Sequence, residues 1–366
     1  MIPDVGDAVL PALGGACVTG ILPALFGRAD DSWLPAPARG GGRAVLLVLD
    51  GLGANAVIEH AAIMPNLAAM DGDAITTVTP STTATALTSI TTGLAPAQHG
   101  LVGYRMRVDR DVLNVLRWTV PDRRNLPDPL DVQRHEPFLG REPPVVTRSE
   151  FRSTGFTKAH LRGGRFVGWQ TDAILVEQCV RCIERGDNFV YAYYPGIDTV
   201  AHEFGLRERA YARELASADR LVGDLRAALP GDVALLVTSD HGQVHLEAES
   251  WLAIDGVDRD VAAMAGDGRF RYLYARPQRA KALYEHAQAA VGDHAWVWTR
   301  SELLDAGLLG TGATGTIPGR IGDVVLIARG PVAFIDPALA HEAHLRSGHG
   351  ALSADEMLVP LRASRG

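Results

Sequence analysis

Three apolar segments that each lead to an aspartate constrain the fold of this chain most strongly. The segments are AVLLVLD ending at Asp50, NFVYAYYPGID ending at Asp198 and DVALLVTSD ending at Asp240. Short apolar runs bounded by turn residues are typical of buried strands, and the carboxyl ends of parallel strands meet at one edge of a sheet. We therefore expect the three carboxylates to gather at that edge.

Two histidines accompany these aspartates. His202 follows Asp198 by four residues, which places both side chains on one face of a helical turn, and His241 follows Asp240 directly. A single aspartate at a strand end usually caps a helix or closes a turn, but three of them with two histidines favour a metal site. Oxygen and nitrogen ligands without a thiolate suit zinc first, with manganese and iron as alternatives.

Length and charge limit the classes of protein that fit. The chain has 366 residues, enough for one large domain or a large domain with a smaller companion. A formal net charge of -8 argues against a nucleic acid polymer as partner, whereas a small phosphorylated substrate remains compatible because a bound metal can dominate the local charge. The sequence does not indicate the oligomeric state.

The cysteines and the N-terminus bear on the cellular compartment. Cys17, Cys179 and Cys182 lack the spacing of a zinc ribbon, and the last two fall in a helical pattern that favours buried thiols over a redox pair. Their odd number favours a reducing compartment. The N-terminus carries Asp4 and Asp7 in place of a basic region, and no apolar run reaches the ~18 residues of a membrane span. We expect a cytoplasmic protein without membrane partners.

The remaining pattern indicates the α/β class: a mostly parallel central sheet with helices on both faces, plus a smaller α+β insertion. We expect a lead-in over 1–43, the first part of the catalytic domain over 44–245, the insertion over 246–335, and a return to the catalytic domain over 336–366. Expected helices cover 54–70, 84–92, 171–185 and 207–229, with a strand over 74–80. Residues 105–165 are expected to form an irregular region of surface excursions and short strands beside the site. Within the insertion we expect strands over 270–277, 294–300 and 323–330, and a helix over 279–291.

A cluster of hydroxyls lies at the start of the helix expected over 84–92. The segment reads Thr-Pro-Ser-Thr-Thr-Ala-Thr over 79–85. Free backbone N–H groups at a helix start favour an anion, and a metal that stabilises an alkoxide turns a hydroxyl into a nucleophile. The alternative is that these side chains only cap the helix. The pattern does not choose between Ser81, Thr82 and Thr83.

Several segments together resemble a known family. VLLVLDGLG, TPSTTATALTSITTGLAPAQHGLVG, GIDTVAHEFG, TSDHG and GHGALSADEMLVPL, in this order and spacing, look like the alkaline phosphatase superfamily and, within it, the nucleotide pyrophosphatase/phosphodiesterase family. The matching segments run from about Arg43 to Leu361. The resemblance implies a two-metal hydrolase of phosphate esters, foremost a phosphodiesterase that forms a phosphothreonyl intermediate.

The resemblance also implies roles for particular residues. The family nucleophile, ten residues before the glycine of Thr-Gly-Leu, falls on Thr83. One divalent ion would be held by Asp198, His202 and His349, and a second by Asp50, Thr83, Asp240 and His241. His349 is the late ligand because Gly-His-Gly matches the family's closing motif, with His341 and His344 as nearby alternatives and His245 as a rim residue.

Two departures from the family pattern concern the substrate. Family members follow the nucleophile with Phe-Pro-Asn-His, where this chain has Ala-Thr-Ala-Leu over 84–87 and so lacks the phenylalanine that helps to sandwich a nucleobase. The family asparagine that contacts a phosphoryl oxygen falls at Tyr104, so Tyr104 or Arg105 would have to donate instead. Tyr193 and Tyr194 either supply an aromatic wall for the substrate or pack within the sheet.

Other activities of the superfamily fit less well or remain open. A sulfatase would need a Cys/Ser-x-Pro-x-Arg motif at the nucleophile, which is absent. A phosphomonoesterase and a phosphonate hydrolase remain as alternatives. From a different class, a metal-binding scaffold that has lost catalysis also remains, because the Phe-Pro-Asn-His run and the asparagine are missing.

Overall fold

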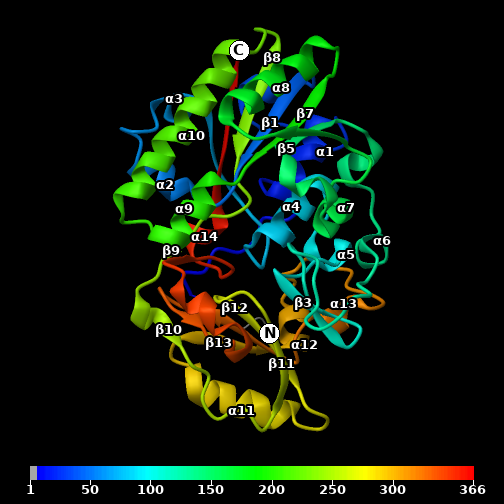
Figure 1. The fold of residues 1–366 in the computed structure, drawn as a ribbon, viewed down its shortest axis with the longest axis vertical. Helices are drawn as coiled ribbons and strands as arrows, with labels where there is room; N and C mark the ends of the chain where they lie inside the picture. The colour runs from blue at the N-terminus through cyan, green and yellow to red at the C-terminus, as the bar shows by residue number, and fades with distance from the viewer. Residues whose placement is uncertain (1–5) are drawn as a thin grey trace.

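The computed structural model describes residues 6–366, so the first five residues of the expected lead-in, with Asp4, lie outside the described residues. Two sheets lie toward opposite ends of the longest axis of the molecule (Figure 1). A seven-stranded sheet includes the first strand and the C-terminal strand, and a four-stranded sheet is built from residues 261–328. This arrangement confirms the predicted α/β class with a mostly parallel central sheet.

The large sheet has the strand order β2-β17-β8-β1-β7-β5-β6. Strand β1 pairs in parallel with β7 on one side and β8 on the other, and only β17 runs against its neighbours. The three predicted aspartate-bearing strands are therefore the central ones. The strands are β1 (Arg43–Leu49), β2 (Asp71–Thr76), β5 (Pro144–Arg148), β6 (Arg165–Trp169), β7 (Phe189–Tyr194), β8 (Val233–Thr238) and β17 (Leu358–Arg365).

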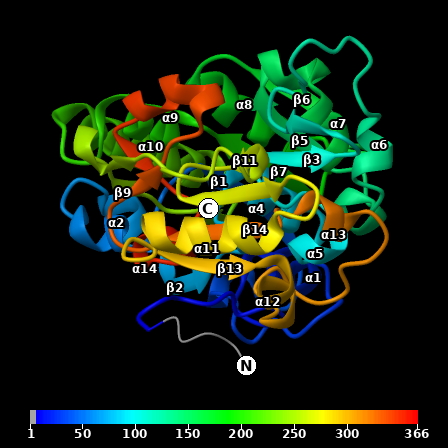
Figure 2. The same ribbon diagram turned by 90° about the horizontal axis from the view of Figure 1, so that it is seen from below.

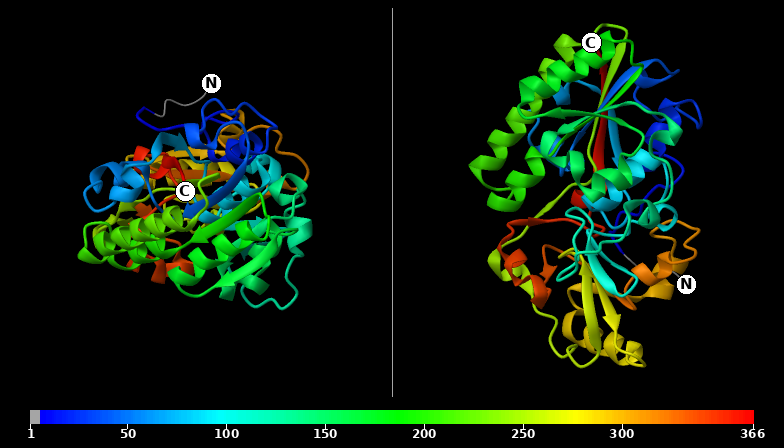
Figure 3. Two further views of the ribbon diagram at one scale, coloured as in Figure 1. Left: turned by 90° about the horizontal axis from the view of Figure 1, so that it is seen from above. Right: turned by 45° about the vertical axis from the view of Figure 1, so that its right-hand side comes forward.

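The central strands are apolar at almost every position because helices cover both faces. In β1, Val45 and Leu47 pack into one core cluster while Leu46 and Val48 pack into the other. The two helix layers lie on either side of the large sheet in Figure 3. One layer contains α3 (Pro65–Ala68), α8 (Asp172–Glu184), α9 (Gly196–Phe204) and α10 (Arg209–Ala228), and the other α1 (Ile21–Leu25), α4 (Thr83–Thr92) and α7 (Gly155–His160).

Two sequence expectations about the first half of the chain need correction. The single helix expected over 54–70 is two short helices, α2 (Ala54–Glu59) and α3. Pro65 begins the second helix because it has no N–H to donate and its fixed φ suits a first helical position. The strand expected over 74–80 is β2, which ends at Thr76, and the next residues form the loop that enters α4.

The region over 105–165 contains the expected short strands, but one of them, β5, belongs to the large sheet and not to a surface excursion. Strand β5 lies between β7 and β6 and pairs in parallel with both, and β6 begins at Arg165. These strands have five residues each and contain proline, arginine or glycine, which hides the apolar pattern. The other elements between 96 and 140 are short: α5 (Pro96–His99), β3 (Arg105–Val108), β4 (Asp111–Asn114) and α6 (Pro129–Val132).

The four-stranded sheet has the antiparallel order β11-β12-β14-β13. Helix α11 (Ala280–Val291) packs against β13 and β14, as Figure 2 shows from below. The other elements of this part are β11 (Val261–Gly266), β12 (Phe270–Ala275), β13 (Ala295–Thr299), α12 (Arg300–Asp305), α13 (Ile317–Arg320) and β14 (Val324–Ala328). Short strand pairs connect it to the large sheet: β9 (Val244–His245) with β16 (Ser347–Gly348), and β10 (Trp251–Leu252) with β15 (Ala333–Phe334).

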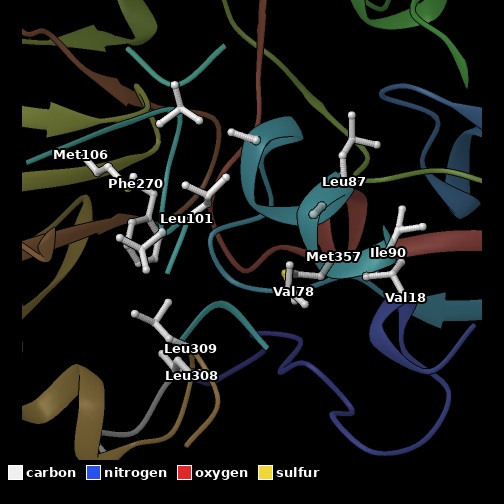
Figure 4. Close-up of a cluster of buried hydrophobic side chains, with 14 of the residues drawn as sticks. Val18, Val78, Leu87, Ile90, Leu101, Met106, Phe270, Leu308, Leu309 and Met357 are labelled. Carbon is white, nitrogen blue, oxygen red and sulfur yellow. The ribbon is translucent and has the colours of Figure 1, made fainter. Parts of the chain in front are cut away.

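One hydrophobic cluster runs from the large sheet to the small one. Around α4 it contains Val18, Val78, Leu87, Ile90 and Met357, and toward the small sheet it continues through Leu101, Met106, Phe270, Leu308 and Leu309 (Figure 4). All ten residues of α4 are buried. The helix that follows the hydroxyl cluster is therefore enclosed by its neighbours, chiefly α1, α5, α7 and the segments over 18–20 and 137–140.

Two further observations concern the expected compartment. Cys17, Cys179 and Cys182 are buried and free of disulfides, and the last two lie within α8 as the helical pattern indicated. Among residues 6–366, no helix has the length and apolar character needed to cross a membrane.

Candidate active site

The three strand-end aspartates meet at the carboxyl edge of the large sheet. Asp50 follows β1 and Asp240 follows β8, whereas Asp198 lies in the first turn of α9, just beyond β7. With three histidines they form two groups of potential metal ligands whose donor atoms lie within 4.8 Å of one another in each group. We call Asp50, Asp240 and His241 the deep group, and Asp198, His202 and His349 the open group.

The deep group has one unused oxygen on each carboxylate. Asp240 Oδ1 accepts hydrogen bonds from the N–H groups of Gly51 (3.1 Å) and His241 (3.0 Å), and Asp50 Oδ2 accepts one from the Tyr193 hydroxyl. Asp50 Oδ1 and Asp240 Oδ2 are buried without a hydrogen-bond partner among the described residues. They lie 3.5 and 3.6 Å from His241 Nε2. Buried unpartnered oxygens that converge on one nitrogen fit a bound cation.

The electrostatics of the deep group also fit a cation. Burial, followed by the negative charges of Asp240 and Asp198, raises the pKa of Asp50 well above its ordinary value. Burial and the charge of Asp198 likewise raise the pKa of Asp240, although His241 opposes this. Ionising two neighbouring buried carboxylates together is costly, and a divalent ion would offset that cost.

The open group is more accessible and is supported by neutral side chains. The Asp198 and His202 side chains are 19% and 21% exposed, and His202 Nε2 lies 3.3 Å from Asp198 Oδ1. His349 Nε2 lies 4.0 Å from the same oxygen. Gln243 Nε2 donates to Asp198 Oδ1 (3.1 Å), and the Ser347 hydroxyl donates to Gln243 Oε1 (2.5 Å). Sequence reasoning missed Gln243 and Ser347, although both stand close to predicted ligands in the chain.

The three histidines share one hydrogen-bonding pattern. In each ring Nδ1 faces a backbone carbonyl, which indicates that Nδ1 carries the hydrogen and leaves the Nε2 lone pair for a cation. The bonds are His241 to Gly242 O (3.0 Å), His202 to Ser347 O (3.1 Å) and His349 to Ser81 O (3.0 Å). Burial, with the nearby His241 and His202, lowers the pKa of His349 well below its ordinary value, so its ring stays neutral. Such a set of neutral nitrogens and carboxylate oxygens suits zinc, manganese or iron.

The hydrogen bonds separate the three hydroxyls that the sequence pattern left equivalent. The Ser81 hydroxyl donates to Ala351 O (2.8 Å), and the Thr82 hydroxyl donates to Asp267 Oδ1 (3.1 Å). Thr83 is the first residue of α4, and its Oγ1 lies 3.1 Å from His241 Nε2. Among the three, the geometry places Thr83 at the deep group and gives the other two structural partners.

Two cavities meet at Thr83. A polar cleft of about 320 Å³ is lined by the open group and by Tyr104, Asp267 and Glu342. An apolar pocket of about 480 Å³ is lined by Leu87, Phe151, Phe156 and Tyr193 and reaches Asp50. Burial raises the pKa of Asp267 to about 7. The cleft and the pocket thus offer different surroundings on the two sides of the threonine.

Only two of the four residues predicted to bind substrate line one of these cavities. Tyr104 lines the polar cleft and Tyr193 lines the apolar pocket. Arg105 lines neither cavity: its buried guanidinium pairs with Asp336 at 2.5 Å. Tyr194 also lies outside both cavities, where it donates to Glu214 Oε1 (2.6 Å) and stacks on a tryptophan ring.

The alternative histidines fall outside both ligand groups. His341 lines the polar cleft, and His245 accepts a hydrogen bond from the Leu206 N–H (3.2 Å) beside an open groove. His344 lies in the same short helical segment as His341. Arg117 lines both cavities, a position that sequence reasoning did not indicate.

An α/β fold with two carboxylate–histidine groups around a helix-start threonine defines the class of metal-dependent phosphoester hydrolases. The chain belongs to the type I phosphodiesterase/nucleotide pyrophosphatase family, whose model matches residues 44–170 and 165–351, and so to the alkaline phosphatase superfamily. No curated protein sequence matches the chain.

Solved structures of low sequence identity share the fold. Murine ectonucleotide pyrophosphatase/phosphodiesterase 5 superposes with a TM-score of 0.67 at 16% identity, over 87% of each chain. An inactive threonine-to-alanine variant of that murine protein, in complex with AMP, gives 0.65 at 15% identity, again over 87% of each chain. The human protein of the same name gives 0.64 at 17% identity over 87% of each chain.

Proposed function

We propose that this phosphoester hydrolase acts on small phosphodiesters through a covalent intermediate on Thr83. The observation that carries the proposal is the position of Thr83 Oγ1, at the first residue of the buried helix α4 and 3.1 Å from His241 Nε2. The hydroxyl lies at the junction of the deep group, the polar cleft and the apolar pocket. A hydroxyl so placed can attack a phosphorus atom held between the two cavities.

The ligand groups fit two divalent ions, zinc first and manganese or iron as alternatives. The deep group with Thr83 would hold one ion, and the open group the other. When bound, such ions lower the pKa of the threonine hydroxyl and neutralise the charge on the leaving oxygen. The unpartnered oxygens of Asp50 and Asp240, and the three histidines whose Nδ1 atoms are bound to backbone carbonyls, support this assignment.

The chain itself supplies the remaining steps. Thr83 Oγ1 loses its proton to solvent and bonds to phosphorus as the bond to the leaving oxygen breaks. The N–H groups of Thr83 and Ala84 can donate to a phosphoryl oxygen, since those of Thr85 and Ala86 already donate to Thr82 O. Water then attacks the phosphothreonine from the side that the leaving group vacates, and the bond to Oγ1 breaks. The polar cleft at the open group gives that water and the leaving group a route to solvent.

Preference for a diester rests on the second cavity. A monoester needs room for one organic group, but Thr83 here has a polar cleft on one side and an apolar pocket of about 480 Å³ on the other. The pocket's aromatic lining suits a flat or apolar substituent that remains on phosphorus. The segment at 84–87 contributes Leu87 to this pocket, so its rings come from other elements than in relatives with Phe-Pro-Asn-His.

Turnover of two chromogenic esters tests the proposal. The metal-loaded protein should hydrolyse bis-(p-nitrophenyl) phosphate faster than p-nitrophenyl phosphate, and Thr83→Ala should lose turnover while keeping bound metal. Thr85→Ala is the matched control, since its buried hydroxyl has no partner among the described residues. Full activity of Thr83→Ala would refute the nucleophile, monoester preference would favour the phosphomonoesterase alternative, and bound metal without any turnover would favour the inactive scaffold.

Two further assignments belong to the same proposal. Zinc as the resident metal is tested by elemental analysis of protein purified without added metal, where manganese or iron in its place would overturn it. The cytoplasmic location rests on the sequence alone and is tested by fractionation of the cells that make the protein.

A further inference from the structure

We infer that Arg117, together with Tyr104, binds the phosphoryl oxygens of the substrate at the junction of the two cavities. This inference rests on the proposed function, since it assumes a phosphorus atom beside Thr83. The residues that line both the polar cleft and the apolar pocket are Thr83, Leu116, Arg117 and Asp198. A diester that fills both cavities must place its phosphorus at that junction. Arg117 is the cationic side chain there.

The loop that carries Arg117 is well anchored. Asn114 and Thr119 exchange backbone hydrogen bonds of 2.8 and 3.2 Å, which closes the loop at the end of β4. The Arg117 N–H donates to Asn114 Oδ1 (2.9 Å), and the buried Trp118 indole donates to Pro127 O (2.9 Å). The backbone at Arg117 is thus fixed from both sides, so its side chain is presented to the junction without rearrangement of the loop.

The Arg117 side chain is available to an anion. It is exposed, and the described part of the chain holds no ion-pair partner for it. Arg269, the other arginine that lines the polar cleft, donates twice to Glu356 at 2.7 and 2.8 Å. Arg105 is paired with Asp336. A free guanidinium beside a reacting phosphoryl group can donate two parallel hydrogen bonds to its oxygens.

Tyr104 supplies a second donor at the same place. Asn114 Nδ2 donates to the Tyr104 hydroxyl oxygen (2.8 Å), which leaves the phenolic hydrogen to donate into the polar cleft. Burial raises the pKa of Tyr104, so the phenol keeps this hydrogen at neutral pH, while the charge of Arg117 acts in the opposite direction. The Asn114 side chain therefore connects both proposed donors.

The test measures anion binding as well as turnover. In the metal-loaded protein, Arg117→Ala should lower kcat/KM for bis-(p-nitrophenyl) phosphate about 100-fold, in the range found when a transition-state donor is removed. It should also weaken inhibition by orthovanadate at least tenfold. Arg117→Lys should restore part of both losses, and millimolar guanidinium should rescue Arg117→Ala but not Thr83→Ala. Tyr104→Phe should show a smaller loss of the same kind.

Arg110→Ala is the matched control, because Arg110 is exposed on the neighbouring β3–β4 turn and lines neither cavity. Unchanged kcat/KM and unchanged vanadate inhibition in Arg117→Ala would overturn the inference while the proposed function stood. Absence of turnover in the wild-type protein would instead refute the proposed function. In that case the inference would be judged by direct calorimetry of orthovanadate binding to wild type and Arg117→Ala, and equal affinities would refute it too.

Discussion

The deep and open groups use similar residue types in opposite surroundings. In the deep group the side chains of Asp50, Asp240 and His241 are between 0 and 3% exposed, whereas those of the open group are between 9 and 21% exposed. The deep carboxylates keep unpartnered oxygens, but Asp198 is supported by Gln243 and the solvent. The same types of ligand can therefore bind a cation with different affinity, depending on how far burial excludes competing water.

Because of this difference in burial, the metal-free state has a higher electrostatic cost in the deep group than in the open group. Without an ion, the deep group confines two acids whose pKa values are raised by burial and by neighbouring negative charge. The open group has no comparable penalty, because water and the Gln243 amide reach its carboxylate. We expect the deep ion to be released last when metal is removed, and its loss to destabilise the fold more.

The largest effect is expected from Asp240→Asn in the deep group. The amide keeps the acceptor for the Gly51 and His241 N–H groups but removes the charge. Turnover should fall at least about 1,000-fold, because the group that activates Thr83 loses a ligand. In EDTA, however, the variant should unfold at a higher temperature than the wild type, since it buries one charge less. If Asp240→Asn unfolded at a lower temperature than the wild type in EDTA, the buried charge would not destabilise the metal-free deep group.

A smaller loss is expected from His202→Gln in the open group. Its ring is partly exposed and shares Asp198 with His349, so the variant should lose one ion while the deep ion stays. Turnover should fall about 100-fold, because only the leaving-group side is weakened. Elemental analysis after dialysis distinguishes the cases. Loss of both ions would show that the two groups do not bind independently.

A still smaller effect is expected from Gln243→Leu, which removes the amide that supports Asp198. Partners of this kind usually contribute about 10–100-fold to metal affinity. Activity should therefore be restored by added metal, with a higher metal concentration at half-activation. Glu249→Gln, an exposed position in the following loop, serves as the control. An unchanged metal concentration at half-activation would show that Gln243 does not support metal binding by the open group.

The smallest effect concerns the apolar pocket behind the deep group, where His160 lines the wall. Burial lowers the pKa of His160 from 6.5 to about 4. At pH values between these two pKa values, the unfolded chain binds a proton on His160 that the folded chain does not. The free energy of unfolding therefore falls as the pH decreases, by at most roughly 1.4 kcal/mol per pH unit for this group. Urea unfolding in EDTA at pH 7 and pH 5 should show a smaller decrease for His160→Leu than for the wild type. Equal decreases would mean that the ring is protonated in the folded protein.

The gathering of the three aspartates with His202 and His241 could be predicted because each stands at a fixed offset from a strand end, whereas His349 was expected only from the family resemblance. Such offsets depend on local geometry alone. The proposed nucleophile was different: residues 81–83 were equivalent by pattern, and only the family resemblance selected Thr83. The distant partners Ala351 and Asp267 now account for the other two hydroxyls.

What could not be predicted depends on contacts between residues far apart in the chain. Arg105 was a plausible donor until its partner was known, and that partner is Asp336. Strand β5 has five residues and becomes recognisable only between β7 and β6. The helix break at Pro65, in contrast, was available in the sequence as a helix-start signal.

The position of β17 has a consequence for biosynthesis. This C-terminal strand lies inside the large sheet, between β8 and β2, and His349 precedes it by only a few residues. A chain emerging from the ribosome can therefore form the deep group before residues 349–365 are made, but the large sheet and the open group are complete only after these residues. We expect a nascent chain that stops before these residues to hydrolyse no phosphoester.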